Sequence, residues 1–214
     1  MAWTTPGTAT AGEVLTAAFW NTNVRDNSIM GSPVYTNEAA RDAAIPAPSE
    51  GMQCYLTAPT VPAATGATTA VPTGVRTIYN GSVWVCVTEV GANSNTSGTT
   101  TSLSYVTTLT GDGTAISVTT VTGTTAEMTF GFNGFVSGGS GAVSSTVSVS
   151  GATTIAAADT NMVRTEGNSV QNSVGTSFVV TGLTAGTNTF TLNYRTTAFT
   201  SNYLRRWLMI KGIA

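Results

Sequence analysis

The C-terminal sequence SFVVTGLTAGTNTFTLNYRTTAFTSNYLRRWLMIKGIA, residues 177–214, predicts three β-strands and the sheet that closes the fold. Phe190, Leu192 and Tyr194 alternate with polar residues, which is the period-two pattern of a strand with one buried face. The run at 204–210 is almost continuously apolar after two arginines, so we expect a strand that is covered on both faces. The core cannot be complete until this last strand has paired.

The same strand pattern extends back to residue 103, with glycine-rich turns at intervals. Seven or eight short strands at regular spacing are typical of a β-sandwich or jelly roll. We therefore predict that 103–214 form one C-terminal sandwich. Its strands are expected at 105–109, 115–121, 127–132, 142–149, 178–180, 190–195 and 204–210.

The rest of the chain divides into three parts that differ in composition. Residues 1–33 combine an extended arm with one amphipathic helix, and residues 34–90 predict a small module with a short helix, a loop at 57–74 and a hairpin across Asn80-Gly81. Residues 91–102, GANSNTSGTTTS, have the composition of a linker. The sequence thus predicts a mainly β protein: an N-terminal arm and helix, a small β-hairpin module and a C-terminal β-sandwich or jelly roll.

The large apolar side chains of residues 1–33 have no core of their own. The helix expected at 13–30 carries a narrow apolar stripe, and the arm before it carries a tryptophan. Such side chains must pack against the neighbouring module or against another chain. We expect attachment or oligomer contacts from Trp3, Leu15, Phe19, Trp20 and Val24.

The charge pattern excludes several classes of partner. Charged residues make up 8% of the 214 residues, against roughly 25% in an average globular chain. A net charge of −2 without clustered Lys or Arg argues against binding to nucleic acid or to an anionic membrane surface. We expect no membrane insertion, because no apolar stretch could span a bilayer, and assembly in a cytoplasm, because the N-terminus has no secretory signal.

The sequence offers few groups for catalysis. Histidine is absent, which excludes Ser-His-Asp triads, Cys-His pairs and His-ligated metal sites. No phosphate-binding glycine motif is present, and no two carboxylates are marked as partners. We therefore expect no enzymatic activity, no cofactor and no metal. Cys54 and Cys86 both fall in expected strands, as two buried thiols or as a disulfide between facing positions.

Two separated blocks near the N-terminus carry a resemblance. They are WTTP at 3–6 with AGEVLTA at 11–17, and NTNVRDN at 21–27. Their order and spacing resemble the N-terminal segment of many tailed-bacteriophage virion proteins. The resemblance implies that this segment attaches the chain to the particle.

A second resemblance lies at the C-terminus. GLTAGTNTFTLNYR followed by NYLRRWLMIKGIA is similar to the closing strands of C1q/TNF-like jelly rolls at the ends of phage fibres. Such domains are typically homotrimers. The resemblance implies that five residues lie in the core or at the trimer interface: Phe190, Leu192, Tyr194, Leu208 and Ile210. The last loop offers a candidate receptor contact, with core packing as the alternative, through Phe199, Asn202 and Tyr203.

Together these resemblances imply a non-enzymatic structural protein of a tailed-phage virion, assembled in the host cytoplasm. In the first interpretation it is a minor tail or short fibre protein that binds other tail proteins through its N-terminus. It then presents a trimeric β-domain to the host surface, where a cell-surface glycan is a candidate partner. In the second it is a decoration protein that binds the major capsid protein and stabilises the head. A carbohydrate-binding module is the third interpretation.

Overall fold

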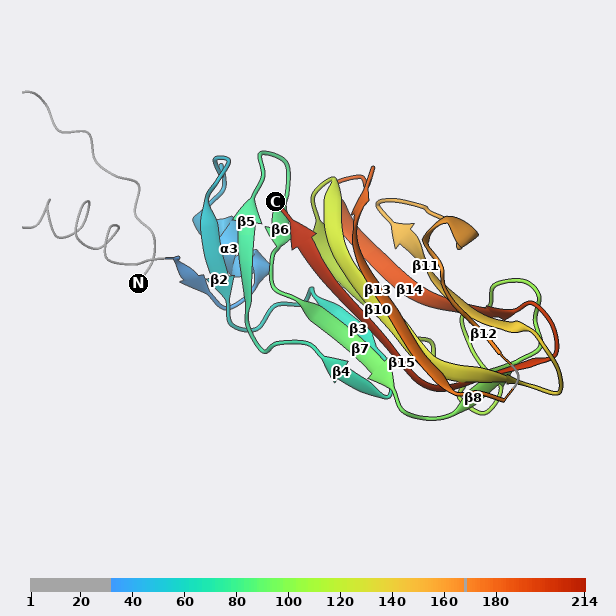
Figure 1. Cartoon of the computed structure of the whole chain (residues 1–214). Helices are drawn as coiled ribbons and strands as arrows, with labels where there is room; N and C mark the ends of the chain where they lie inside the picture. Colours follow the sequence, from blue (N-terminus) through green and yellow to red (C-terminus); the bar gives the residue numbers. More distant parts are fainter. Residues whose placement is uncertain (1–31, 168) are drawn as a thin grey trace, which may run out of the picture.

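The computed structural model describes residues 32–167 and 169–214, which are mainly β with one α-helix. Figure 1 shows a small sheet at one end of this part of the chain and a two-layered sandwich beside it. The predicted fold class is confirmed. The arm and the helix expected at 13–30 lie outside the described residues. No helix within the described ranges is long and apolar enough to cross a membrane.

The small module is a four-stranded sheet with one short helix. The helix α3 (Glu38–Ala44) begins at Asn37, whose side-chain oxygen accepts a hydrogen bond from the backbone N–H of Ala40 at 3.0 Å. The strands lie in the order β1 (Val34–Tyr35), β2 (Gln53–Leu56), β5 (Val75–Tyr79) and β6 (Trp84–Cys86). The core of this module consists of Tyr35, Ile45, Cys54, Leu56, Val75, Trp84 and Cys86.

The hairpin predicted across Asn80-Gly81 joins β5 to β6, but its loop has four residues rather than two. The Asn80 side-chain oxygen accepts hydrogen bonds from the backbone N–H groups of Ser82 and Val83, at 3.1 and 3.0 Å. Gly81 has a φ of +88°, which other residues adopt only at a cost. The Asn80 side chain therefore organises the loop by closing a local turn on its own backbone.

The expected loop at 57–74 contains two strands that join the sandwich. β3 (Ala63–Thr65) pairs with β9 (Ser117–Thr122), and β4 (Thr68–Ala70) pairs with β7 (Val90–Ser94). β3 is the edge strand of one sheet of the sandwich and β4 is the edge strand of the other, so this segment forms an edge of both layers. Its Pro, Thr and Ala composition has no apolar alternation, which is why the pattern did not predict strands.

The predicted linker at 91–102 is wrong. It contains most of β7 and all of β8 (Gly98–Thr100), and both strands pair with β15 (Thr200–Ile213). Val90 and Ala92 are buried in the sandwich core. Small residues here let the strand fit closely between neighbours, so the continuous run of sandwich strands begins at 90 and not at 103. The strand expected at 105–109 is reduced to isolated bridges.

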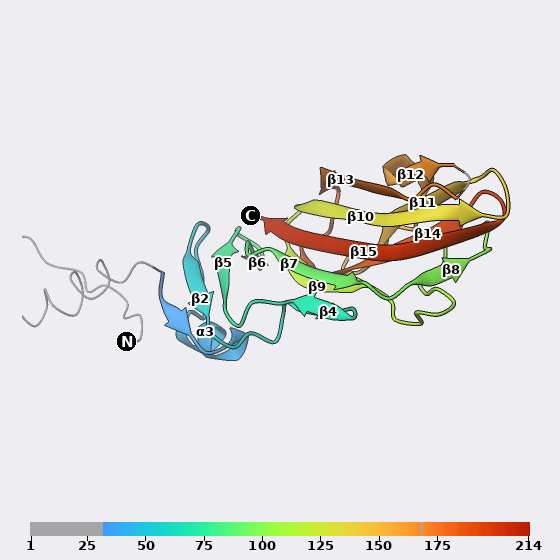
Figure 2. The ribbon, with the colours of Figure 1, turned by 60° about the horizontal axis from the view of Figure 1, so that its bottom comes forward.

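The two layers have the pairing of a jelly roll. One sheet has the order β13 (Asn172–Thr181), β10 (Thr125–Ser137), β15, β7, β4 (Figure 2), with β8 also paired to β15. The other has the order β12 (Val163–Glu166), β11 (Ala142–Gly151), β14 (Gly186–Thr196), β9, β3.

Eight of these strands, β7 and β9 to β15, form nested antiparallel pairs. The first pairs with the last, the second with the seventh, the third with the sixth and the fourth with the fifth. Nested pairs of this kind are the arrangement of a double-sheet jelly roll. β15 is a central strand, because β10 flanks it on one side and β7 and β8 on the other.

A β-bulge divides β15 into two halves. β10 pairs Gly134 with Tyr203 and Asn133 with Arg205, so Leu204 is an extra residue on β15. A Cβ on Gly134 would overlap a backbone carbonyl of β15, so only glycine fits beside the bulge. The extra residue shifts the alternation of β15 by one position.

The bulge decides which side chains of β15 face the core. Tyr203 and Arg206 are both fully buried, although they are three positions apart. Trp207 and Met209 lie on the outer face of the sheet, where each is half-buried. The strand expected to be covered on both faces is therefore covered on one only.

Arg206 forms a buried ion pair with Asp112 on the segment between β8 and β9. The Asp112 carboxylate also accepts hydrogen bonds from the Ser94 hydroxyl at 2.6 Å and the Thr114 backbone N–H at 3.2 Å. Arg206 donates a further hydrogen bond to the Thr96 carbonyl at 3.1 Å. These contacts fasten the segment from β7 to β9 to the centre of the six-stranded sheet.

Burial alone would raise the pKa of the Asp112 carboxyl. The hydrogen bonds from Ser94, Thr114 and Arg206, with the charge of Arg206, outweigh burial and hold that pKa below its ordinary value. A carboxyl whose pKa is lowered by folding stabilises the fold above its unfolded pKa of about 4. That stabilisation is lost as the pH falls through the folded pKa.

We expect Asp112→Asn to lower the free energy of unfolding at pH 7 by about 3 kcal/mol, because it leaves Arg206 as an uncompensated buried charge. Urea unfolding measured from pH 7 to pH 3 should show the wild type and the variant converging below about pH 4. The control is Asp159→Asn. Asp159 pairs with Arg195 at 2.7 Å but is half-exposed, so this variant should lose less than about 1 kcal/mol. Equal losses in the two variants would contradict the role of the buried pair.

Candidate functional site

The five residues assigned to a trimer core lie inside the single chain. Each exposes 1% of its surface or less, and each packs between the two sheets of the sandwich: Phe190, Leu192, Tyr194, Leu208 and Ile210. The resemblance implied the core or the trimer interface for these residues, and the core placement is confirmed. A side chain without exposed surface has none to offer to a second chain, so the interface placement is wrong. The predicted attachment residues lie outside the described part of the chain: Trp3, Leu15, Phe19, Trp20 and Val24.

The three residues of the candidate receptor loop have different environments. Tyr203 is a core residue whose hydroxyl donates to the carbonyls of Ser144 and Arg195, at 2.7 and 3.0 Å. Asn202 is half-buried and its side-chain amide bonds within the sheet. Phe199 is exposed over 53% of its surface. Tyr203 is therefore removed from the candidate receptor contact, and Phe199 is the residue best placed to touch a partner.

Phe199 belongs to the loop between β14 and β15, and this loop forms a tip at the end of the sandwich that lies away from the small module (Figure 1). The Phe199 ring lies over the turn between β10 and β11, where a Cβ on Gly139 would overlap the ring. The backbone of Phe199 has a φ of +57°, which is uncommon for a bulky residue. Glycine thus leaves the space that holds an exposed aromatic ring in a defined position.

Trp207 forms a second aromatic feature on the outer face of the six-stranded sheet. The registers put Gly131 of β10 beside Trp207, and Gly175 of β13 beside Gly131. The indole ring occupies the space that side chains at both positions would fill, and a Cβ on Gly175 would lie 3.0 Å from it. β15 and β13 are two strand spacings apart, about 10 Å, so the ring lies along the sheet and not upright on it.

A hollow of about 410 Å³ adjoins this ring, a volume within the range of small-ligand sites. Asn133 lies between Ser173 and Arg205 in the row next to Trp207. The Asn133 side-chain oxygen is buried and accepts no hydrogen bond within the described residues. We call this hollow the Trp207 site, and its lining is Asn93, Asn133, Ser173, Arg205, Trp207 and Met209.

Reasoning from the sequence did not find the Trp207 site. Trp207 was expected to be covered, because the run around it is apolar. Gly131 and Gly175 were the available signal, since a glycine inside a strand often marks the close approach of another group. The sequence does not reveal that these two glycines are neighbours, because only the register of β10, β13 and β15 aligns them.

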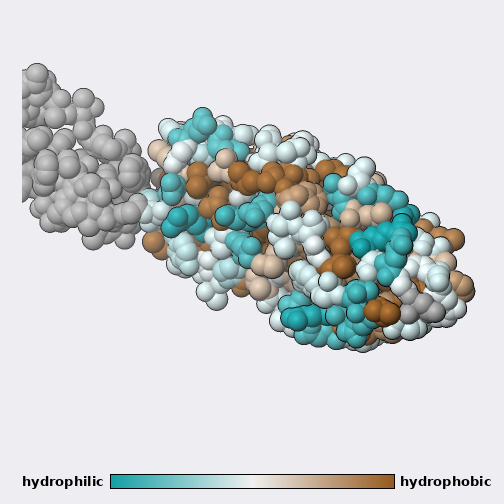
Figure 3. Space-filling view, viewed as in Figure 1, coloured by the Kyte–Doolittle hydropathy of each residue, from teal (hydrophilic) through white to brown (hydrophobic). Residues whose placement is uncertain are grey.

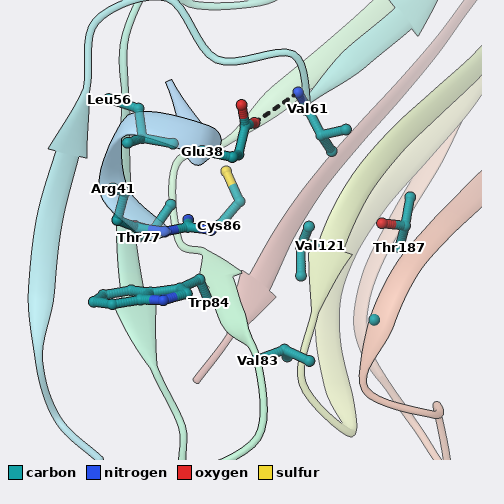
Figure 4. Close-up of a pocket in the computed structure, with 11 residues that line it drawn as sticks. Glu38, Arg41, Leu56, Val61, Thr77, Val83, Trp84, Cys86, Val121 and Thr187 are labelled. Atoms are coloured by element: carbon teal, nitrogen blue, oxygen red, sulfur yellow. Dashed lines mark hydrogen bonds between the residues drawn. The ribbon is translucent and has the colours of Figure 1, made fainter. Parts of the chain in front are cut away.

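A smaller pocket of about 260 Å³ lies between the small module and the sandwich (Figure 4). The Glu38 carboxylate accepts hydrogen bonds from the backbone N–H groups of Thr60 and Val61, at 3.0 Å each. Burial would raise the Glu38 pKa, but these bonds outweigh it and lower the pKa. Arg41 lies 4.9 Å from the ring of Trp84. Ligand sites usually exceed about 300 Å³, and these charged groups are already partnered, so we assign this pocket to packing.

The two cysteines are buried free thiols. Cys54 and Cys86 lie on either side of Thr77 in the small sheet, so their Cα atoms are two strand spacings apart, about 10 Å. A disulfide needs Cα atoms within about 7 Å, which rules out the disulfide alternative. The Cys54 sulfur lies 3.0 Å from the Thr77 hydroxyl oxygen, and burial raises the pKa of both thiols.

A further hollow on the described surface contains two cationic side chains. It measures about 530 Å³ and includes Tyr55, Arg76 and Lys211 in its lining. Figure 3 shows that the surface over the sandwich is largely hydrophilic or neutral, with an apolar area where the small module meets it. Within 32–167 and 169–214, no group of three or more His, Cys, Asp or Glu side chains could hold a metal ion.

A scan against protein-family models finds no match for the chain, and neither does a search of curated proteins. The interpretation of the Trp207 site and of the Phe199 tip therefore rests on their own geometry.

We expect Cys54 and Cys86 to react slowly with a thiol reagent at pH 8 in the native protein, because both are buried and their raised pKa leaves little thiolate. In guanidinium chloride both should react at once, with no reductant added. The measurement is the time course of labelling, followed by mass spectrometry of each peptide. A requirement for reductant before labelling would contradict the free-thiol assignment.

Proposed function

We propose that this chain is a non-enzymatic structural protein of a tailed-phage virion. Its N-terminal segment binds other virion proteins, and its jelly roll faces outward toward the host. The two N-terminal sequence blocks at 3–17 and 21–27 support the attachment role. The particle is then its place of action, after assembly in the host cytoplasm.

The observation that carries the proposal is the polarity of the described chain. The described part of the chain begins at Ser32, next to the small module. The loop that carries Phe199 lies at the opposite end of the sandwich (Figures 1 and 2). A chain fastened through residues before 32 would therefore hold the tip away from its point of attachment. This arrangement suits a minor tail or short fibre protein that touches a host surface.

The charged groups of the sandwich support a structural role. Three carboxylates of the sandwich form ion pairs with arginines: Asp112 with Arg206, Asp159 with Arg195 and Glu166 with Arg164. Carboxylates that serve a glycosidase lie as a facing pair about 5–10 Å apart, free to exchange protons. The carboxylates named here are instead engaged with guanidinium groups.

A homotrimer remains part of the proposal, but its contacts must come from other residues than those of the jelly-roll core. The apolar residues of 1–33, such as Trp3 and Trp20, are our candidates for contacts with sister chains or with the particle. Exposed apolar residues at the module end of the outer face, Val179 and Ile213, offer further surface.

We expect the double substitution Trp3→Ala with Trp20→Ala, made in the full chain, to reduce incorporation into particles at least about tenfold, because losing an aromatic anchor costs ~2 kcal/mol or more. The measurement is quantitative mass spectrometry of purified particles, with cryo-electron microscopy for position. Few copies at the tail are expected.

The matched control is Phe199→Ala. It should leave incorporation unchanged but weaken adsorption to host cells, since it alters only the opposite end of the chain. Many copies spread over the head would replace the tail assignment with the decoration role. Purified particles without the chain would refute the proposed function altogether.

A further inference from the structure

We infer that the Trp207 site binds an acidic glycan, with one sugar ring on the indole face and an acid group at Arg205. The inference goes beyond the structural role proposed above. It would hold for the isolated chain whether or not the chain belongs to a virion.

Trp207 does not serve the core of the sandwich. Leu208 and Ile210, on the opposite face of β15, fill the space between the sheets. Trp207 lies on the outer face, over backbone that two aligned glycines leave bare. A large ring kept in a flat position outside a complete core presents a planar apolar surface on which a ligand can stack.

A polar row lies beside the ring. Asn133 lines the hollow with an amide side chain, whose oxygen finds no hydrogen-bond donor within the described residues. Ser173 and Asn93 add a hydroxyl and an amide at the same hollow. A sugar ring matches both features, since its C–H face packs on an aromatic ring and its hydroxyls donate and accept hydrogen bonds.

The hollow also carries a positive charge. Arg205 is the charged residue of the hollow, it is exposed, and its guanidinium forms no ion pair within the described residues. Glu127 and Lys211 are directly opposite each other on the same face, two rows beyond Trp207. Lys211 is four residues from Trp207, roughly 13 Å along the strand, so Arg205 dominates the electrostatic field at the hollow. Guanidinium groups bind carboxylates in bidentate geometry, which favours an acidic sugar over a neutral one.

Other kinds of ligand fit less well. A nucleic acid needs clustered cations, and the chain carries eight Lys and Arg residues in all with a net charge of −2. A stable protein partner usually covers about 800 Å² with an apolar centre. Among the described residues, Met209 is the one large apolar neighbour of Trp207 on this face. The other residues in its row and in the two flanking rows are small, polar or charged: Gly131, Gly175, Asn93, Ser173, Asn133, Arg205, Ser177, Thr129 and Gly91.

The test is isothermal titration of the purified full chain with sialyllactose and with trigalacturonic acid. The methyl ester of each sugar serves as its neutral counterpart. We expect at least one acid to bind, and its ester to bind at least about tenfold more weakly. Arg205→Gln should weaken binding of the acid by a similar factor, and Trp207→Ala should abolish it. Trp207→Tyr keeps a flat ring and should retain part of the affinity, which separates loss of stacking from loss of folding.

Lys211→Gln is the matched control, because it removes the same charge from the same face of β15 but outside the Trp207 site. It should leave binding unchanged. The inference is overturned if neither acid binds, if the esters bind as well as the acids, or if Lys211→Gln weakens binding as much as Arg205→Gln. The last outcome would move the site to the hollow that Lys211 shares with Arg76. Absence of the chain from particles would leave these titrations unaffected, so the two proposals can fail separately.

Discussion

The pairing of β15 with β7 and β8 is the constraint on which the rest of the structure depends. These strands come from opposite ends of the sandwich sequence, so the six-stranded sheet is incomplete until they meet. The buried pair of Arg206 and Asp112 fixes the same junction through side chains. Removing two charges from water is costly, and hydrogen bonds with Ser94, Thr96 and Thr114 offset part of that cost. Arg206 Nε and Nη1 have no hydrogen-bond partner within the described residues.

The bulge at Leu204 links this closure to the outer surface. Because it shifts the alternation of β15, Arg206 turns inward to meet Asp112 while Trp207 turns outward. The same local irregularity therefore supplies both the internal ion pair and the external aromatic ring. If the same residues alternated regularly from Tyr203 without a bulge, Arg206 would face outward and the indole of Trp207 would face the core.

The molecule offers contacts of two kinds, and they have different physical origins. The Phe199 tip is an aromatic ring held at the end of the sandwich by glycines of a turn, which suits a first contact with a surface. The Trp207 site lies on the side of the sandwich and combines a flat ring with unpaired polar groups, which suits a small ligand. A protein anchored at its N-terminal end could use both together.

The sequence by itself determined the β class, the strands at 115–121, 127–132, 142–149 and 190–195, and the burial of Phe190, Leu192 and Tyr194, because alternation along one strand is a local property. Only the tertiary structure decided which strands are neighbours in the sheets. The strands in 57–74 and 91–102 take their hydrogen-bond partners from distant segments and carry little apolar signal of their own. The Trp207 site likewise depends on Gly131, Gly175 and Trp207 coming into register across three strands, and no local pattern encodes that alignment.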